Sequence, residues 1–190
     1  MAEPVYDLTI TNGILATHET SEAVNIAITD GRFAALGDVS ADQGREHIDA
    51  TGLTILPGVI DTQVHFREPG IEHKEDLQSG SLAAVMGGVT GVFEMPNTKP
   101  PTTTAEAIED KVARATNRMH CDFAFYVGGT HENAEQLPKL EKMTGVCGVK
   151  VFMGSSTGNL LVPDDDGVAD ILKFIRRRAA FHSEDEFRLR

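Results

Sequence analysis

The chain changes its sequence rhythm at Pro57-Gly58, and this change limits the folds that it can adopt. Before this point, short alternating runs are broken by turn signals such as Asn12-Gly13 and Asp30-Gly31. These dipeptides favour β-hairpins, because both turn positions take positive φ angles. After this point, short apolar strands alternate with helical patterns. The sequence therefore predicts a small all-β unit over residues 1–56, followed by parallel βα units over residues 57–190.

Five strands and four helices are expected in the second part. The helices are predicted over residues 75–87, 104–119, 132–143 and 164–178. The strands are predicted from residue 55 to the stop at Pro69-Gly70, over residues 88–96, 121–127 and 146–152, and from 179 onward. Polar side chains gather where the strands end, which is typical of the catalytic face of a (β/α)8 barrel. An open doubly wound sheet has the same rhythm, but no GxGxxG motif follows the first strand.

The predicted barrel is incomplete, because a whole (β/α)8 barrel takes about 250 residues. We therefore expect an α/β fold with the first part of a TIM-type barrel, about five βα units, in a chain that is truncated. The isolated chain is the amino-terminal part of a longer protein in this interpretation.

The composition excludes several classes of partner. A net charge of -12 argues against nucleic acid, since binding to phosphates needs concentrated lysine and arginine. Cys121 and Cys147 form neither a CxxC pair nor a disulfide framework, which fits a reducing compartment. No apolar run reaches the roughly 18 residues of a membrane span. These features predict a cytoplasmic protein that binds a small-molecule substrate and neither nucleic acid nor membrane.

Polar side chains at the strand ends indicate metal chemistry. Gln63 and His65 share one face of the first barrel strand, because residues two apart on a strand point the same way, and Arg67 is next on that face. Lys150 and His182 lie at or near later strand ends. Imidazoles on separate strands can converge on one divalent ion, so the set suggests a metal-assisted hydrolase. The ordinary alternative for each histidine is a hydrogen-bonded core or surface residue.

Four segments resemble, in order, the motifs of the dihydroorotase branch of the amidohydrolase superfamily. They are residues 61–70 (DTQVHFREPG), 95–98 (MPNT), 148–153 (GVKVFM) and 182–185 (HSED). The amino-terminal β unit is similar to the small sandwich that flanks the barrel in this superfamily. The resemblance implies a zinc-dependent hydrolase that interconverts N-carbamoyl-L-aspartate and L-dihydroorotate in pyrimidine biosynthesis, with water activated by the metal.

The resemblance also implies the metal ligands. His65 matches the second histidine of a His-x-His motif, whereas Gln63 stands at the position of the first. Glutamine offers only a neutral amide oxygen, which suits zinc less well than imidazole. The number of bound metal ions, one or two, is therefore left open. Lys150 matches a lysine that forms a carbamate bridging two metals; the alternative is an ion-paired lysine. His182 matches the histidine ligand of the fifth strand.

Two further residues match substrate ligands. Arg67 and Asn97 correspond to residues that hold the substrate carboxylate, and a planar guanidinium can donate two parallel hydrogen bonds to such a group. The alternative is an ion pair of Arg67 with Glu68 or Glu72. The family's catalytic aspartate would lie beyond Arg190, so we expect no catalytic residue within this chain and no turnover by the chain alone.

Other functions stay open at this level. One alternative is a different cyclic amidohydrolase, such as a hydantoinase, dihydropyrimidinase or allantoinase. Another is a non-catalytic dihydroorotase-like scaffold that supports a transcarbamoylase partner, a hypothesis motivated by Gln63. A homo-oligomer is expected in either case.

Overall fold

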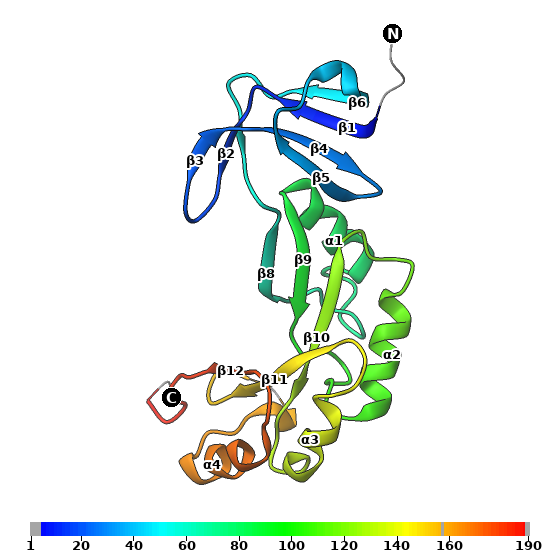
Figure 1. The fold of residues 1–190 in the computed structure, drawn as a ribbon. Coiled ribbons are helices and arrows are strands. Elements are labelled where there is room, and N and C mark those ends of the chain that lie inside the picture. Colours follow the sequence, from blue (N-terminus) through cyan, green and yellow to red (C-terminus); the bar gives the residue numbers. More distant parts are fainter. Residues whose placement is uncertain (1–4, 157, 189–190) are drawn as a thin grey trace. The chain divides into compact units, whose positions relative to one another are not determined.

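The structure is a computed structural model, and it describes residues 5–156 and 158–188 (Figure 1). The chain forms two compact units, Met1–Pro57 and Gly58–Arg190. No helix in the described part of the chain is both long and apolar enough to cross a membrane.

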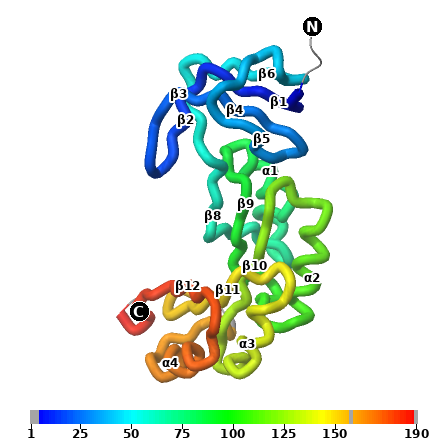
Figure 2. The backbone as a smooth tube through the Cα atoms, viewed as in Figure 1, coloured from blue at the N-terminus to red at the C-terminus, as the bar shows by residue number. Residues whose placement is uncertain are grey.

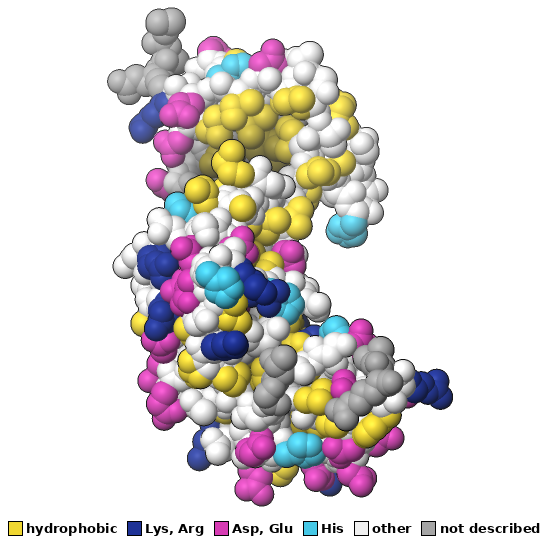
Figure 3. Space-filling view, turned by 180° about the vertical axis from the view of Figure 1, so that it is seen from behind, with side chains coloured by type: hydrophobic (Ala, Val, Ile, Leu, Met, Phe, Trp, Pro, Cys, Tyr) yellow, Lys and Arg dark blue, Asp and Glu magenta, His cyan; other side chains and the backbone are white. Residues whose placement is uncertain are grey.

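The first unit is all β, as the sequence predicts, and contains two small sheets. The larger sheet has the strand order β5-β4-β1-β6 and comprises β1 (Tyr6–Thr11), β4 (Asn25–Thr29), β5 (Arg32–Gly37) and β6 (Gly44–Asp49), with the short helix η1 (Ala41–Gln43) before β6. The smaller sheet has the order β3-β2-β7 and comprises β2 (Ile14–Ala16), β3 (Ser21–Ala23) and β7 (Thr54–Ile55). Several large hydrophobic side chains of this unit are exposed, and such side chains gather on its surface in Figure 3.

One of the two predicted hairpins is correct and the other is wrong. Asp30 and Gly31 have φ angles of 51° and 69° and join the antiparallel strands β4 and β5. At Asn12-Gly13 the chain instead passes from one sheet to the other, since β1 pairs with β4 and β6 while β2 pairs with β3 and β7. Only Asn12 takes a positive φ angle there, 65°. Gly13 is needed for close packing, because a Cβ atom would lie 2.5 Å from the side chain of Ile55.

The second unit is a curled parallel sheet with helices on one face, the first part of a barrel (Figures 1 and 2). Its strand order is β12-β11-β10-β9-β8, and the strands are β8 (Val59–Val64), β9 (Val89–Glu94), β10 (Asp122–Gly128), β11 (Val146–Phe152) and β12 (Ala179–His182). All neighbouring strands are parallel. The helices are α1 (Leu77–Met86), α2 (Ala105–Ala115), α3 (Leu137–Leu140) and α4 (Asp165–Phe174), with the short helices η2 (Ala134–Gln136) and η3 (Gly158–Leu160). The prediction of about five βα units in a partial TIM-type barrel is confirmed.

The hydrophobic core lies between the sheet and the helices. One cluster joins Val149 and Val151 of β11 to Leu137 and Ile171 of the helices, and a second contains Phe66. The Phe66 ring fits against α1 because Gly80 has no side chain; a Cβ atom there would lie 2.5 Å from the ring. The segment after β8 is thus fixed against the helix layer.

All four helices are shorter than the sequence suggests. The helix predicted over residues 75–87 is α1 (Leu77–Met86), and the helix predicted over residues 104–119 ends at Ala115. The helix predicted over residues 132–143 is reduced to η2 and the four-residue α3. The helix predicted over residues 164–178 ends at Phe174, because the main-chain N–H groups of Arg176 and Arg177 donate to the buried carboxylate of Glu141 at 3.1–3.2 Å. A side-chain acceptor therefore takes the place of the last helical carbonyls.

Candidate functional site

The predicted site residues lie at or near the carboxyl ends of the strands. His65 follows β8, Asn97 follows β9, Lys150 lies on β11 and His182 ends β12. The parallel register pairs Phe152 with His182 on neighbouring strands. These strand ends share one edge of the sheet, which is where barrel enzymes place their active sites.

His65 and Asn97 are joined directly. The Nδ1 atom of His65 lies 2.9 Å from the Oδ1 atom of Asn97. Because an amide oxygen can only accept, the imidazole must donate from Nδ1, which leaves the lone pair of the neutral ring on Nε2. Burial lowers the pKa of His65, and the positive charges of Arg67 and Lys150 lower it further, although the hydrogen bond to Asn97 opposes them. The ring is therefore held in the neutral form that can bind a metal.

Lys150 is buried without a counter-charge. Its residue is 1% exposed, and it makes no ion pair within residues 5–156 and 158–188. Its Nζ atom lies 5.0 Å from the ring centroid of Phe152, and burial lowers its pKa. The structure therefore does not support the alternative of an ion-paired lysine. It provides the environment in which a lysine amine is most readily neutral.

His182 has a buried ring nitrogen next to a carboxylate. Its Nε2 atom makes no hydrogen bond within the described residues, although Glu184 Oε2 lies 3.1 Å away. Its ring centroid lies 6.0 Å from that of Phe152, which also contacts Lys150. An imidazole at a strand end, with a carboxylate beside its ring nitrogen, fits the role of a metal ligand.

Gln63 is placed differently from the other candidates. Its side chain is exposed, and the pairing of β8 with β9 is irregular between Asp61 and Val64. The carboxylate of Asp61 accepts a hydrogen bond from the main-chain N–H of Gln63 at 2.9 Å. No group of three or more His, Cys, Asp or Glu side chains in the described part of the chain is arranged to hold a metal ion.

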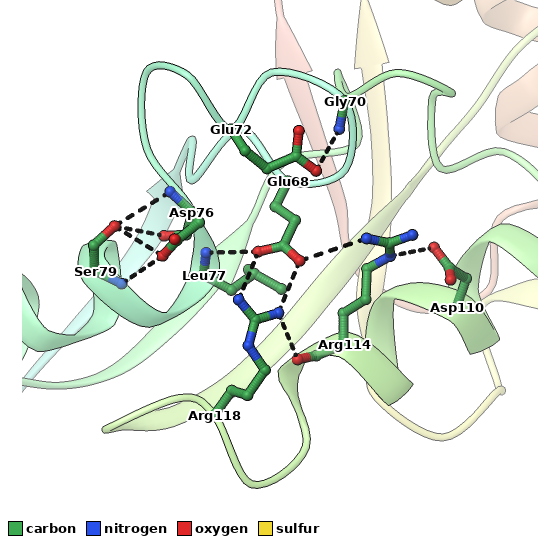
Figure 4. Close-up of polar contacts among 9 residues, drawn as sticks. All are labelled: Glu68, Gly70, Glu72, Asp76, Leu77, Ser79, Asp110, Arg114 and Arg118. Carbon is green, nitrogen blue, oxygen red and sulfur yellow. Dashed lines mark hydrogen bonds and ion pairs between the residues drawn. The ribbon is translucent and has the colours of Figure 1, made fainter.

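Arg67 is not paired with either carboxylate that the sequence offered as a partner. The Glu68 side chain is held by Arg118, and that of Glu72 accepts the main-chain N–H of Gly70 at 2.8 Å (Figure 4). Arg67 makes no ion pair in the described part of the chain. Its guanidinium therefore remains available for an anion from outside the chain, as a substrate ligand requires.

Two residues that support the site were not predicted. Lys111 of α2 forms a buried ion pair with Glu94 at the end of β9, and its Nζ atom also donates to the carbonyl oxygen of Met95 at 3.0 Å. Burial raises the pKa of Glu94 to about 7, while Lys111 and Arg67 lower it. The pair fixes the end of β9 just before Asn97. Lys111 is spaced to share the buried helix face, and this was the signal that could have identified it.

The fold and the position of these side chains define the first part of a (β/α)8 barrel with a polar site at its strand ends. The model of the family described as "Dihydro-orotase-like" matches residues 52–150. The chain belongs to this family.

Curated relatives and solved structures agree with this assignment. A dihydroorotase of Methanosarcina mazei is 35% identical over 184 residues, covering 95% of this chain and 40% of that protein. An allantoinase of Rubrobacter xylanophilus is 38% identical over 167 residues, covering 87% of this chain and 36% of that protein. The structure of an L-hydantoinase (dihydropyrimidinase) from Arthrobacter aurescens matches with a TM-score of 0.87 and 30% identity, covering 96% of this chain and 42% of that one. The chain thus spans about 40% of the length of these relatives.

Proposed function

We propose that the full-length protein is a cyclic amidohydrolase of the dihydroorotase type, which interconverts N-carbamoyl-L-aspartate and L-dihydroorotate. The observation that carries this proposal is the guanidinium of Arg67, which makes no ion pair within the described residues. It lies on the loop after β8, next to the loop that carries Asn97. Glu68 and Glu72 are engaged elsewhere, so an external carboxylate is the natural partner of Arg67. L-dihydroorotate carries such a carboxylate on its ring.

We further propose that zinc is held by His65, by His182 and by Lys150 in its carbamate form. His65 presents Nε2 because Asn97 engages Nδ1, and the buried Nε2 of His182 faces only the exposed carboxylate of Glu184 among the described residues. Burial of Lys150 favours the neutral amine that carbamate formation requires. Zinc, when bound, would lower the pKa of water and polarise the ring carbonyl. Gln63 would contribute at most a neutral oxygen.

A second candidate is the hydrolysis of a ring without the carboxylate, as by an allantoinase or hydantoinase. The similarity to an allantoinase and to a solved L-hydantoinase supports this alternative. Substrate profiling of the zinc-loaded full-length protein with L-dihydroorotate, allantoin, hydantoin and dihydrouracil separates the two. We expect kcat/KM for L-dihydroorotate to exceed the others by about a hundredfold or more, because Arg67 would be left without a partner on the other rings. A preference for allantoin or hydantoin would contradict the first proposal.

A third hypothesis is a non-catalytic scaffold for a transcarbamoylase, and it is motivated by Gln63. This hypothesis can be tested directly. Metal analysis of the full-length protein purified from zinc-replete medium distinguishes it. At least one zinc ion per chain is expected of the enzyme, whereas the scaffold predicts a substoichiometric amount and no turnover.

A further inference from the structure

We propose that Glu68 is a positioning residue that sets the place of Arg67 and thereby the affinity for the substrate carboxylate. This inference rests on the proposed function, in which Arg67 binds that carboxylate. Glu68 itself is buried, 4% exposed, and points away from the site into the helix layer. It would act through the loop that it shares with Arg67.

The carboxylate of Glu68 joins three elements (Figure 4). Nη1 and Nη2 of Arg118, just beyond α2, donate to its two oxygens at 2.8 and 3.2 Å. Nη1 of Arg114 lies 3.6 Å from Oε1, and the main-chain N–H of Leu77, at the start of α1, donates to Oε2 at 3.1 Å. Such a two-pronged arginine contact fixes orientation as well as position. The loop after β8 is therefore tied to both helices at Glu68.

Arg67 needs such a neighbour because its backbone is in an unfavourable conformation. Its φ angle is 63°, in the left-handed region that residues with a side chain rarely adopt. Its carbonyl oxygen accepts the N–H of Ile71 at 3.0 Å, which closes a tight turn. A residue in this region stays there only when the surrounding structure holds it. Glu68 is the adjacent residue and carries the strongest side-chain contacts of the turn.

The same loop is fastened to the loop that carries Asn97. The carbonyl oxygen of Pro69 accepts the main-chain N–H of Lys99 at 2.9 Å. Gly70, with a φ angle of 88°, packs against the Lys99 backbone so closely that a Cβ atom would collide with the Lys99 carbonyl oxygen. Both proposed substrate ligands, Arg67 and Asn97, thus depend on one connected pair of loops.

The test is a double-mutant cycle in the zinc-loaded full-length protein. Glu68→Gln keeps the shape of the side chain and removes its charge, and Arg118→Lys keeps a charge and removes the planar fork. Each is made in the wild-type protein and in the Arg67→Ala background, with Asp170→Asn as the control, because it breaks only an exposed pair with Lys173 on α4. Steady-state KM and kcat for L-dihydroorotate are measured together with the thermal unfolding midpoint.

The expected result is a rise in KM of about tenfold for Glu68→Gln and a smaller rise for Arg118→Lys, with kcat within about twofold of wild type. In the Arg67→Ala background neither change should raise KM further, since the residue through which it acts is gone. Asp170→Asn should leave both constants unchanged.

Equal rises in KM in both backgrounds, or a fall in kcat with KM unchanged, would overturn the role of Glu68. If Glu68→Gln does not fold, the milder Arg118→Lys decides by the same comparison. A wild-type protein that does not turn over L-dihydroorotate contradicts the proposed function instead. The two failures are therefore distinguishable.

Discussion

The side chains of His65 and Asn97 meet at 2.9 Å, so a proposed metal ligand and a proposed substrate ligand share one hydrogen bond. The bond uses the amide oxygen of Asn97 and Nδ1 of His65, which leaves the amide N–H groups for a substrate and Nε2 for a metal. Groups of this kind behind a ligating histidine fix its tautomer and orientation. In the proposed site, Asn97 would therefore both orient His65 and bind the substrate.

Substitutions of Asn97 should separate these duties in the full-length protein. Asn97→Ala removes the acceptor for His65, and we expect zinc affinity to fall about tenfold or more. Asn97→Asp keeps an acceptor and should retain zinc, but its negative charge should raise KM for L-dihydroorotate. Zinc dissociation constants from chelator competition measure the first effect. Equal loss of zinc in both variants would contradict this division of roles.

Lys111→Met should destabilise the protein by about 3–5 kcal/mol, because it leaves the carboxylate of Glu94 buried and unpaired. The double variant Glu94→Leu/Lys111→Met removes both charges and should recover most of this loss. Urea unfolding followed by circular dichroism gives the free energies. A double variant that loses the sum of the two single effects would show that the residues act independently.

Glu68 should make stability depend on pH in the acid range. Burial alone would raise its pKa, but the hydrogen bonds from Arg118 and Leu77 outweigh burial and hold the pKa below the ordinary 4.5. The folded state then binds fewer protons than the unfolded state, so the contribution of Glu68 is present above pH 4.5 and is lost as the pH falls through the folded pKa. The unfolding midpoints of wild type and Glu68→Gln should differ at pH 7 and approach each other below pH 4.5. A difference between the two unfolding midpoints that grows as the pH falls would contradict this assignment.

Gly70→Ala should cost more stability than Gly31→Ala, although both glycines have positive φ angles. The Gly31 site has open space around it, so alanine there meets only the backbone penalty of about 1–2 kcal/mol. At Gly70 the added Cβ atom also strikes the backbone of Lys99, which adds about 1–3 kcal/mol. Chemical unfolding of the two variants makes the comparison. Equal losses of stability in the two variants would mean that the loop of Gly70 can move away from Lys99 without a cost in free energy.

The sequence predicted what depends on local pattern. The change of rhythm at Pro57-Gly58 correctly predicted an all-β unit and then parallel βα units, and residue spacing predicted that Lys150 and His182 lie on neighbouring strands. The failures arose where distant partners decide the local structure. Gly13, for example, allows close packing against Ile55 and does not form a hairpin turn.

The contacts that support the site could not be predicted from local sequence patterns either. Arg118 is 50 residues from Glu68, and Lys111 meets Glu94 only when α2 packs on the sheet. The competing interpretation of Arg67 as the partner of Glu68 could be rejected only with the partners of that carboxylate in view.

The most direct test of the proposed function is kcat/KM for L-dihydroorotate in the full-length protein and its Arg67→Ala and Arg67→Lys variants. We expect a loss of about a hundredfold or more for Arg67→Ala, and a smaller loss for Arg67→Lys, which keeps the charge without the fork, while each variant retains its bound zinc. A wild-type value of kcat/KM in Arg67→Ala would contradict the assignment of Arg67 as the ligand of the substrate carboxylate.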